Sequence, residues 1–363
     1  MEDLYFAVSW GNQEKIDKQN SWSGTNYQMF QHLQEYYHVI EVATDFVNIP
    51  VLKPLAAVRK AERILGYNDM ELGEISLMNR VLKKKLPDSA TVFSFTECPD
   101  CSIGERHFIY QDLSALYLYQ MQKKSPRIFE VSGFKDNSTR TLRKRSMSQK
   151  SYYEGCDGIF TMSQWLADFL SRKYKDKVHH VGGGANIDSS RIVDGEKEGN
   201  KFLFVGRDFI RKNGDLVVRS FIKLHEKYPD TELYIAGPEH LEIDEAGVHC
   251  LGDLSYDQLL PYFNACDYFV LPSLFEAYGL VFPEALTFGL PCIGRDAYEM
   301  PYFIEEGKTG LLLEHNSSDE LAGLMEQLLL HPSFKENVMD KRQWYIEEYS
   351  WDTVVRRIAS VIG

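Results

Sequence analysis

The feature that most constrains the fold is a regular alternation of short apolar segments with amphipathic segments in the second half of the chain. The apolar segments end in Gly or Ser, and helical patterns follow: KFLFVG at 201–206, ELYIAG at 232–237, VHCLG at 248–252, YFVLPS at 268–273 and PCIG at 291–294. Strands that alternate with helices form βα units around a parallel sheet. We therefore expect a doubly wound α/β domain in this half.

The first half shows a looser version of the same pattern. Predicted strands are LYFAVSW at 4–10, HVIEVATD at 38–45, TVFSFTE at 91–97, HFIYQD at 107–112 and GIFTMS at 158–163. After Gly24, apolar residues recur at helical spacing, and Thr25 with Gln28 forms a candidate capping box. We expect a helix that begins just after Gly24 and a second doubly wound domain.

The chain length of 363 residues also favours two domains. Residues 186–200 are polar and charged, which is typical of an interdomain linker. We predict an α/β protein of two Rossmann-like domains, at 1–188 and 201–345, joined by a linker at 189–200, with a C-terminal helix within 346–363. Ligands of such sheets bind at the carboxyl ends of the strands, so both domains are expected to face one cleft.

Composition restricts the compartment and the class of partner. The N-terminus, MEDLYFAVSW, has acids where a signal peptide needs bases, and the chain has no apolar run of about 18 residues, so we expect a cytoplasmic protein. Six dispersed cysteines suit a reducing compartment. The net charge of −13 and the lack of a recognition motif argue against nucleic acid.

The positive charge is concentrated in the first half, where positions 51–150 hold 18 Lys and Arg against 11 Asp and Glu. Three basic segments carry much of it, at Val51–Leu65, Asn79–Leu86 and Lys135–Lys150. They are either solvated helix faces or a surface that docks on anionic lipid. The sequence does not indicate an oligomeric state.

Two acids stand out in the apolar stretch LFEAYGLVFPEA, at 274–285. Glu276 follows a predicted strand, and Pro283 at the first position of a helix would place Glu284 in its first turn. Glu284 either complements the helix dipole or contacts a ligand. Carboxylates accept hydrogen bonds from sugar hydroxyls.

Free amides at the start of the same helix, at Gly279, Leu280 and Val281, could hold a phosphate. Cations for a diphosphate follow another strand end, where Arg207 and Lys212 come after Gly206 in VGRDFIRKNG. Each cation alone could be a solvated surface charge. Acids and cations at strand ends of one sheet together favour a nucleoside diphosphate sugar as the ligand.

These segments resemble the retaining GT-B glycosyltransferases of family GT4. VGRDFIRKNG is similar to the Arg and Lys segment of that family and FEAYGLVFPEA to its E-x7-E segment. SWSGTNYQMFQHL, CDGIFTMSQWLADFL, VGGGANID and GKTGLLLEHNSSDELAGLM resemble further pieces of the family in the same order. The resemblance implies the GT-B fold, with acceptor binding in the N-terminal domain and donor binding in the C-terminal domain.

The resemblance also implies roles for the donor-site residues. Glu276 would contact the donor sugar, Glu284 the ribose, and Arg207 and Lys212 the diphosphate. The amides of Gly279, Leu280 and Val281 would contact the phosphate or the sugar, and Gly206 would precede the cation loop. Gly24 is similar to the glycine loop that closes over the diphosphate, or else it is a simple turn before a helix.

The implied reaction is hexosyl transfer with retention at the anomeric carbon, without a metal or a cofactor. UDP is the commonest base in such donors, and the acceptor would be a glycan or a lipid-linked molecule, as in cell-surface polysaccharide biosynthesis. At the position of the family's N-domain histidine this chain offers Asp112, a candidate for a residue near the reacting carbon or for the cap of the next helix.

Two features depart from the pattern, and two alternative functions stay open. Asn213 separates Lys212 from Gly214, where the family usually has Lys-Gly. Cys98 and Cys101 with His107 begin a zinc-like spacing that lacks a fourth ligand. A non-catalytic subunit that binds glycan or stabilises a partner enzyme is the main alternative function. A GT-B phosphorylase is a second alternative, although such chains are usually longer and carry a cofactor lysine motif. The final SWDTVVRRIASVIG is expected to cross back to the N-terminal domain, as in the family.

Overall fold

The computed structural model describes residues 1–10, 18–19, 21, 24–43, 79–80, 82–95, 99–186, 189–193, 195 and 199–363. These residues form two compact units, one of Met1–Gly184 with Trp351–Gly363 and the other of Ala185–Ser350. The second unit begins before the linker that the sequence suggested, and the last helix belongs to the first unit. The basic segment Val51–Leu65 lies outside the described residues.

The first unit contains a parallel sheet with the strand order β2-β1-β3-β4-β5-β6. Its strands are β1 (Asp3–Val8), β2 (His38–Ala43), β3 (Thr91–Phe95), β4 (Arg106–Gln111), β5 (Gly158–Thr161) and β6 (Val178–His180). All five strands predicted for this half are confirmed. β6 was not predicted, because its three residues include two histidines and form no apolar run.

Helices pack on both faces of this sheet. They are α1 (Thr25–Leu33), α4 (Ala115–Lys124), α5 (Pro126–Val131), α6 (Thr139–Gly155), α7 (Gln164–Tyr174) and α15 (Trp351–Ile362), with a 3₁₀ turn, η3 (Lys175–Lys177). On one face, Phe6 of β1 stacks on Phe93 of β3 and meets Phe30 of α1 edge to face. On the other, Ile109 and Ile159 pack with apolar side chains of α6 and α7. The sheet is therefore doubly wound.

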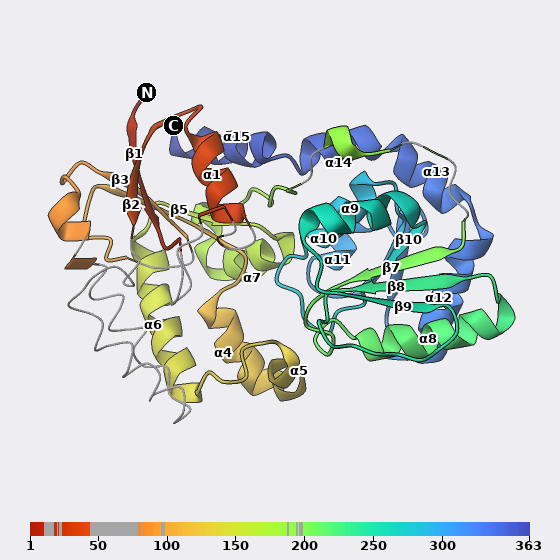
Figure 1. Cartoon of the computed structure of the whole chain (residues 1–363). Coiled ribbons are helices and arrows are strands. Elements are labelled where there is room, and N and C mark those ends of the chain that lie inside the picture. Colours follow the sequence, from red (N-terminus) through yellow and green to blue (C-terminus); the bar gives the residue numbers. More distant parts are fainter. Residues whose placement is uncertain are drawn as a thin grey trace. The chain divides into compact units, whose positions relative to one another are not determined.

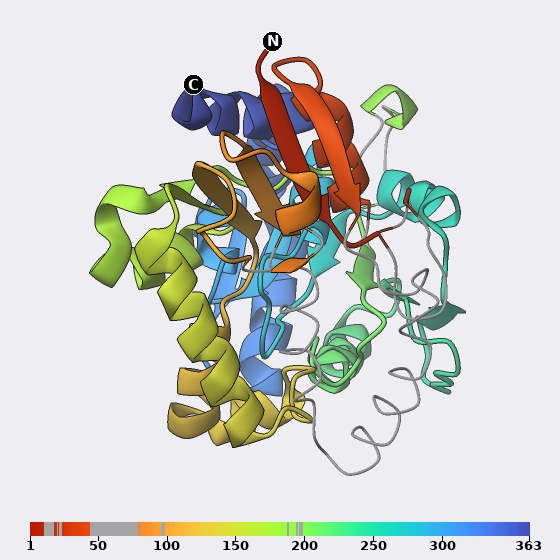
Figure 2. The same ribbon diagram turned by 90° about the vertical axis from the view of Figure 1, so that its left-hand side faces the viewer.

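The C-terminal helix α15 lies against α1 (Figures 1 and 2). His32 Nδ1 on α1 lies 2.7 Å from Asp352 Oδ1 on α15, and the Trp351, Val354 and Ile358 side chains of α15 are buried. The last helix thus completes the core of the unit that also contains the N-terminus.

The entry to α1 differs from the sequence prediction. The helix begins at Thr25, directly after Gly24, but Gly24 itself is the capping residue, at φ 84°, and no side chain caps the helix. Thr25 is buried and lies inside the first turn, and the buried Asn26 side chain donates to the Ser9 carbonyl. The capping box of Thr25 and Gln28 is therefore wrong, because burial of Thr25 replaces its capping role.

The second unit contains a parallel sheet with the order β12-β11-β10-β7-β8-β9. Its strands are β7 (Lys201–Val205), β8 (Glu232–Ala236), β9 (Val248–Gly252), β10 (Tyr268–Val270), β11 (Cys292–Arg295) and β12 (Gly310–Leu313). The five predicted strands are confirmed, and β12 is an addition. The order places β7 and β11 on either side of β10, so the loops that follow these three strands are neighbours.

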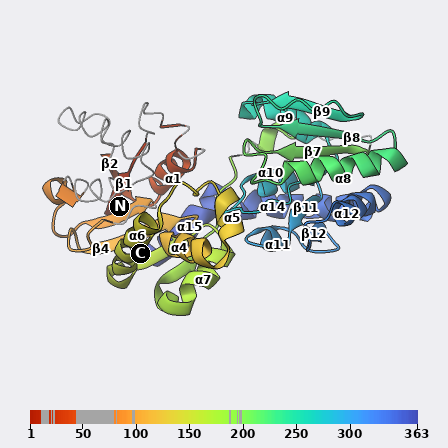
Figure 3. The ribbon, with the colours of Figure 1, turned by 90° about the horizontal axis from the view of Figure 1, so that it is seen from below.

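Helices again cover both faces, with α8 on the opposite side of β7 and β8 from α9 (Figures 1 and 3). The helices are α8 (Gly214–Lys227), α9 (Tyr256–Ala265), α10 (Val281–Thr287), α11 (Met300–Phe303), α12 (Ser318–Leu330), α13 (Ser333–Asp340) and α14 (Arg342–Glu348), preceded by a 3₁₀ turn, η4 (Ser189–Arg191). Both units are thus doubly wound Rossmann-like α/β structures, as predicted.

Among the helices of the described residues, none is long and apolar enough to cross a membrane. The cysteines in the same part of the chain, Cys101, Cys156, Cys250, Cys266 and Cys292, are free thiols.

Candidate functional site

The candidate donor residues of the second unit gather at the carboxyl edge of its sheet. Lys212 lies in the loop after β7, and Glu276 lies in the loop after β10. Because β7 and β10 are hydrogen-bonded neighbours and run parallel, these loops emerge side by side. Lys212 Nζ lies 3.2 Å from Glu276 Oε2, so the structure brings the predicted cation and the predicted acid together.

Glu276 is 8% exposed and receives three hydrogen bonds on one carboxylate oxygen. Lys212 Nζ, Arg211 Nη1 and Ser273 Oγ all donate to Oε2, at 3.2, 3.3 and 3.2 Å. Burial acts to raise the pKa of Glu276, but Lys212 and Arg211 outweigh it, so the pKa is lowered. Glu276 is ionised at neutral pH, and within the described residues its Oε1 receives no hydrogen bond.

Gly206 explains how the Lys212 side chain reaches Glu276. A Cβ on Gly206 would lie 1.9 Å from Lys212 Cδ, far inside van der Waals contact. The aliphatic stem of Lys212 therefore passes directly over the backbone at the end of β7. Any side chain at position 206 would displace the lysine.

Arg211, which the sequence analysis did not select, is the second cation at Glu276. Its Nη1 also donates to the Phe275 carbonyl at 2.9 Å, and its Nε donates to Asp208 Oδ2 at 3.2 Å. By contrast, the Arg207 side chain is 77% exposed and pairs with Asp253 at 2.8 Å. Arg207 thus lies in the predicted loop but makes no contact with Glu276.

The start of α10 differs by two residues from the prediction. The helix begins at Val281, so Pro283 is its third residue rather than its first, and Glu284 still lies in the first turn. Gly279 has φ 97°, and a Cβ there would lie 3.1 Å from both Glu276 Cγ and Phe282 Cδ2. Both the conformation and the space require glycine at this position.

The amides of Gly279, Leu280 and Val281 have no protein acceptor within the described part of the chain. The first amides of any helix lack intrahelical partners. These three groups lie directly after Glu276 in the same loop and can donate to an anionic or hydroxyl-bearing ligand.

Glu284 is only partly exposed, and burial raises its pKa to about 8, against a smaller lowering effect of Lys212. No donor to its carboxyl group is present among the described residues. The two acids of the segment therefore differ: Glu276 is held ionised by cations, whereas Glu284 is largely protonated at neutral pH until a ligand supplies donors.

The extra residue Asn213 has a defined place in the loop. It adopts the left-handed conformation at φ 62° directly before α8, which Asn tolerates better than most residues. Its Nδ2 donates to the Pro272 carbonyl at 3.3 Å and to Asn316 Oδ1 at 2.7 Å. Arg295 Nη2 also donates to Asn316 Oδ1, at 2.8 Å, so the loops after β7, β10, β11 and β12 are linked.

In the first unit, Gly24 is the left-handed residue before α1, and Asp112 follows the carboxyl end of β4. Ser114, rather than Asp112, caps α4, because Ser114 Oγ accepts from the Leu116 amide at 3.1 Å. The capping interpretation of Asp112 is therefore wrong. Its neighbour Gln111 is fully buried and bonds Tyr153 Oη.

The zinc-like segment has ordinary partners where it is described. Cys101 Sγ donates to the Tyr152 carbonyl, and burial raises its pKa to about 11. His107 Nε2 lies 2.9 Å from the Ile103 carbonyl oxygen. Cys98 lies outside the described residues. Over the described ranges, a group of three metal-compatible side chains occurs at His32, Glu35 and Asp352, where α1 meets α15.

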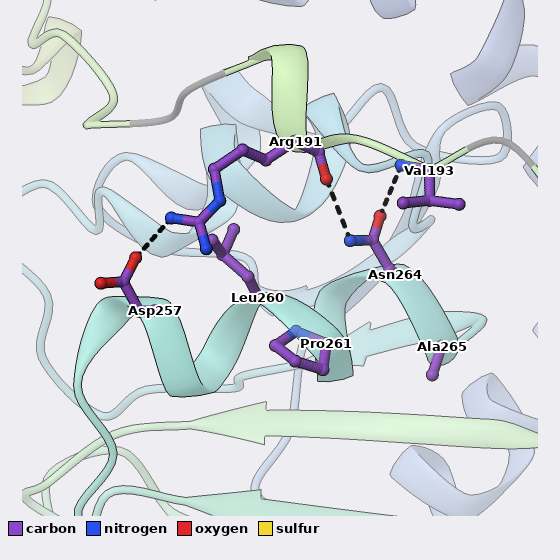
Figure 4. A pocket seen from close by; sticks show the side chains of 7 residues that line it. All are labelled: Arg191, Val193, Asp257, Leu260, Pro261, Asn264 and Ala265. Carbon is purple, nitrogen blue, oxygen red and sulfur yellow. Dashed lines mark hydrogen bonds and ion pairs between the residues drawn. The ribbon is translucent and has the colours of Figure 1, made fainter.

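A shallow pocket of about 460 Å³ lies along α9, away from the candidate donor residues (Figure 4). Arg191 pairs with Asp257 across it, and Asn264 bonds both the Arg191 carbonyl and the Val193 amide. Its lining residues include none of the residues predicted for the donor site. The contacts fasten the segment after η4 onto α9.

Comparisons with known proteins agree with this architecture. Residues 187–343 match the family model described as glycosyl transferases group 1. The chain is 24% identical over 291 residues to an uncharacterised glycosyltransferase of Methanocaldococcus jannaschii, which covers 72% of this chain and 73% of that protein.

Solved structures show the same fold over the whole chain. Sucrose-phosphate synthase from Thermosynechococcus elongatus superposes with a TM-score of 0.68 at 14% identity, covering 100% of this chain and 98% of that chain. WaaG, a glycosyltransferase involved in lipopolysaccharide biosynthesis, gives a TM-score of 0.65 at 14% identity and covers 99% of both chains. The predicted GT-B fold class is confirmed.

Proposed function

We propose that this glycosyltransferase, whose residues 187–343 match the model of glycosyl transferases group 1, moves a hexosyl group from a nucleoside diphosphate sugar, with retention at the anomeric carbon and without a metal. The acceptor is a glycan or a lipid-linked molecule. The second unit binds the donor, and the first unit selects the acceptor.

One observation carries the proposal: three donors hold Oε2 of Glu276 and leave its Oε1 for a ligand. An ionised carboxylate that is fixed in this way is prepared to accept hydrogen bonds from vicinal sugar hydroxyls. The partner-free amides of Gly279, Leu280 and Val281 follow in the same loop and suit a phosphate or sugar oxygen.

The cations of the β7 loop stabilise the diphosphate as it leaves. The Lys212 side chain is only 12% exposed and lies beside Glu276, where a fixed charge acts more strongly than in water. Arg207 forms an exposed ion pair with Asp253. Such pairs contribute about 0–1 kcal/mol to stability, so a bound diphosphate can replace Asp253 as the partner of Arg207. Cations placed in this way can supply the charge stabilisation that other transferases obtain from a metal.

Further contacts follow from the resemblance to family GT4. Glu284 accepts hydrogen bonds from the ribose hydroxyls, and Gly24 gives the first unit a backbone contact with the diphosphate. Asp112, at the carboxyl end of β4, lies near the reacting carbon. UDP is the proposed base.

The location and acceptor belong to the same proposal. The protein works in the cytoplasm, and its basic first unit contacts the anionic inner face of the membrane, where a lipid-linked acceptor for cell-surface polysaccharide would lie. A chain that only bound glycan would not need Lys212 and Arg211 fixed beside Glu276, which favours the enzyme over a non-catalytic subunit.

Product stereochemistry tests the reaction class. The donor identified by binding is incubated with enzyme at high concentration, and proton NMR follows the sugar released to water before mutarotation. An α-linked donor should release the α anomer first. Release of the β anomer would refute retention.

Metal independence has a separate test. Turnover should be unchanged after dialysis against EDTA, with donor consumption as the readout. Activity that disappears with EDTA and returns with a divalent ion would contradict the metal-free proposal while leaving the donor site intact.

A further inference from the structure

Tyr298, in the loop after β11, has an unusual backbone conformation. Its φ is 57°, and among the described residues Asn213 is the other non-glycine residue with positive φ. For residues other than Gly, Asn and Asp this conformation is unfavourable, because it brings Cβ too close to the following carbonyl oxygen. Strain of this kind persists where the surroundings impose it, and it is concentrated at ligand sites.

The surroundings of Tyr298 are the loop that holds Glu276. The Tyr298 ring meets the Phe275 ring edge to face, with centroids 5.0 Å apart and planes at 86°. Phe275 is 2% exposed and directly precedes Glu276 in the chain. The strained tyrosine is thus packed on the residue next to the proposed sugar-binding carboxylate.

Arg295 links the loop after β11 to the loop after β10 by hydrogen bonds. At the end of β11, its Nε donates to the Ser273 carbonyl at 3.0 Å and its Nη2 to the Pro272 carbonyl at 3.3 Å. Directly before Tyr298, the Ala297 amide donates a hydrogen bond to the Arg295 carbonyl oxygen at 2.7 Å. The position of Tyr298 is therefore fixed relative to Glu276.

An aromatic ring near a carboxylate is chemically suited to bind a hexose. A hexose presents hydroxyl edges and C–H-rich faces, and a tyrosine offers an apolar ring with one polar tip. Sites for small polar ligands combine such apolar walls with a few placed polar groups. Tyr298 lies in the loop after β11 and is of intermediate solvent exposure.

We infer that Tyr298 is a specificity-determining residue of the donor subsite and forms the wall against which the sugar held by Glu276 packs. The inference rests on the proposed donor function. In this inference the loop after β11 discriminates among hexosyl groups, and the loops after β7 and β10 bind the nucleoside diphosphate.

The test compares Tyr298→Gly, which suits the positive φ, with wild type. A calorimetric panel of UDP-glucose, UDP-galactose, UDP-N-acetylglucosamine and GDP-mannose, with UDP and GDP, first identifies the preferred donor. Tyr298→Gly should keep the Kd for the bare nucleoside diphosphate within twofold. Its Kd for the preferred sugar nucleotide should rise at least tenfold, while its Tm stays equal or rises because strain is removed.

Controls separate the possible outcomes. Tyr302→Ala removes a 51% exposed tyrosine from the neighbouring α11 and should change neither Kd. Tyr298→Phe keeps the ring and should keep the preference. If Tyr298→Gly fails to fold, Tyr298→Asn serves instead, because Asn tolerates this conformation.

An unchanged ratio of the two Kd values in the folded variant would overturn the inference, and a shifted Tm alone would mean that Tyr298 is only structural. Wild-type protein that binds neither sugar nucleotides nor nucleoside diphosphates would overturn the proposed function itself.

Discussion

At the scale of single residues, Lys212 is the side chain on which the proposed chemistry depends most. Its side chain is only 12% exposed, lies beside Glu276 and passes over the backbone of Gly206. Lys212→Ala should lower kcat/KM by about 10²–10³, in the range found for removing one preorganised group that stabilises developing charge. Lys223→Ala is the matched control, because Lys223 is an exposed lysine of α8 paired with Asp319. Rates that fall equally in both variants, or in neither, would remove Lys212 from the site.

Glu284 gives a second residue-scale prediction, which concerns pH. Its pKa is ordinarily 4.5 and is raised to about 8 in the folded protein, so between these values the folded state binds more protons than the unfolded chain. The contribution of Glu284 to stability is therefore present below pH 4.5 and is lost as pH rises toward 8.

Glu284→Gln should remove this loss and leave a variant more stable than wild type at pH 8. A gain of about 1 kcal/mol would raise Tm by roughly 2–4 °C, and the gap should close at pH 5. Thermal melting curves of wild type and Glu284→Gln at pH 8 and pH 5 measure this difference in Tm. A gap that is equal at both pH values would show that Glu284 is not protonated in the fold.

The sequence located some of these residues and not others, for physical reasons. Glu276 and Lys212 were predictable because each follows a strand, and parallel strands place their following loops at one edge. Arg211 was not, because whether Arg207 or Arg211 turns toward Glu276 depends on the path of the loop before Asn213. Tyr298 gave no signal, since a positive φ at tyrosine violates the preference from which sequence predictions are made.

At the scale of elements, α15 shows how distant parts of the sequence complete one core. Its side chains pack on α1, more than 300 positions away, and Ile358 is fully buried. Ile358→Ala should destabilise the first unit by about 2–5 kcal/mol, the usual range for such a truncation in a core. Ser360→Ala, on the exposed side of the same helix, should have little effect. Chemical denaturation measures both, and equal stability of the two variants would contradict the packing of α15.

The strands were predicted more completely than the helix ends. Ten strands follow from apolar runs bounded by turn residues, whereas β6 contains two histidines, and β12, with the sequence Gly-Leu-Leu-Leu, was not predicted. The start of α1 just after Gly24 was predicted correctly, but its capping box, the cap of α4 and the start of α10 were misjudged, because burial of Thr25, the cap at Ser114 and the early start at Val281 depend on tertiary packing. Capping signals in the sequence are local, whereas packing in the core determines where these helices begin and which residue caps them.

At the scale of the whole molecule, charge is divided unequally along the chain. Residues 123–150 hold nine Lys and Arg and two Asp and Glu in a protein of net charge −13. Along α6, Arg140, Arg143, Met147 and Lys150 recur at helical spacing and are exposed, Met147 at 61%. α4, α5 and α6 lie together in the first unit (Figure 3). A basic face with a protruding apolar residue suits an anionic lipid surface.

Vesicle sedimentation tests this surface. Wild type should bind vesicles rich in phosphatidylglycerol and release them at high salt, because exposed charges are screened. Arg143→Glu with Lys150→Glu should weaken binding by roughly tenfold or more, at about 1 kcal/mol per basic residue near the surface. The control is Lys223→Glu with Lys308→Glu in the second unit, which changes the net charge by the same amount. Equal losses in both variants would indicate only net charge and would refute a membrane surface on α6.

The most direct test of the donor site is a thermal shift of wild type and Glu276→Gln against UDP-, GDP-, ADP- and dTDP-sugars, CMP and the bare nucleoside diphosphates. A ligand at 100 times its Kd stabilises the fold by about 2.7 kcal/mol, so wild type should show a raised Tm with one nucleoside diphosphate sugar. Glu276→Gln should keep its secondary structure by circular dichroism and lose most of the shift caused by the sugar nucleotide. No shift with any donor at millimolar concentration, or an equal shift in both proteins, would contradict the assignment of Glu276 and its loop as the donor site.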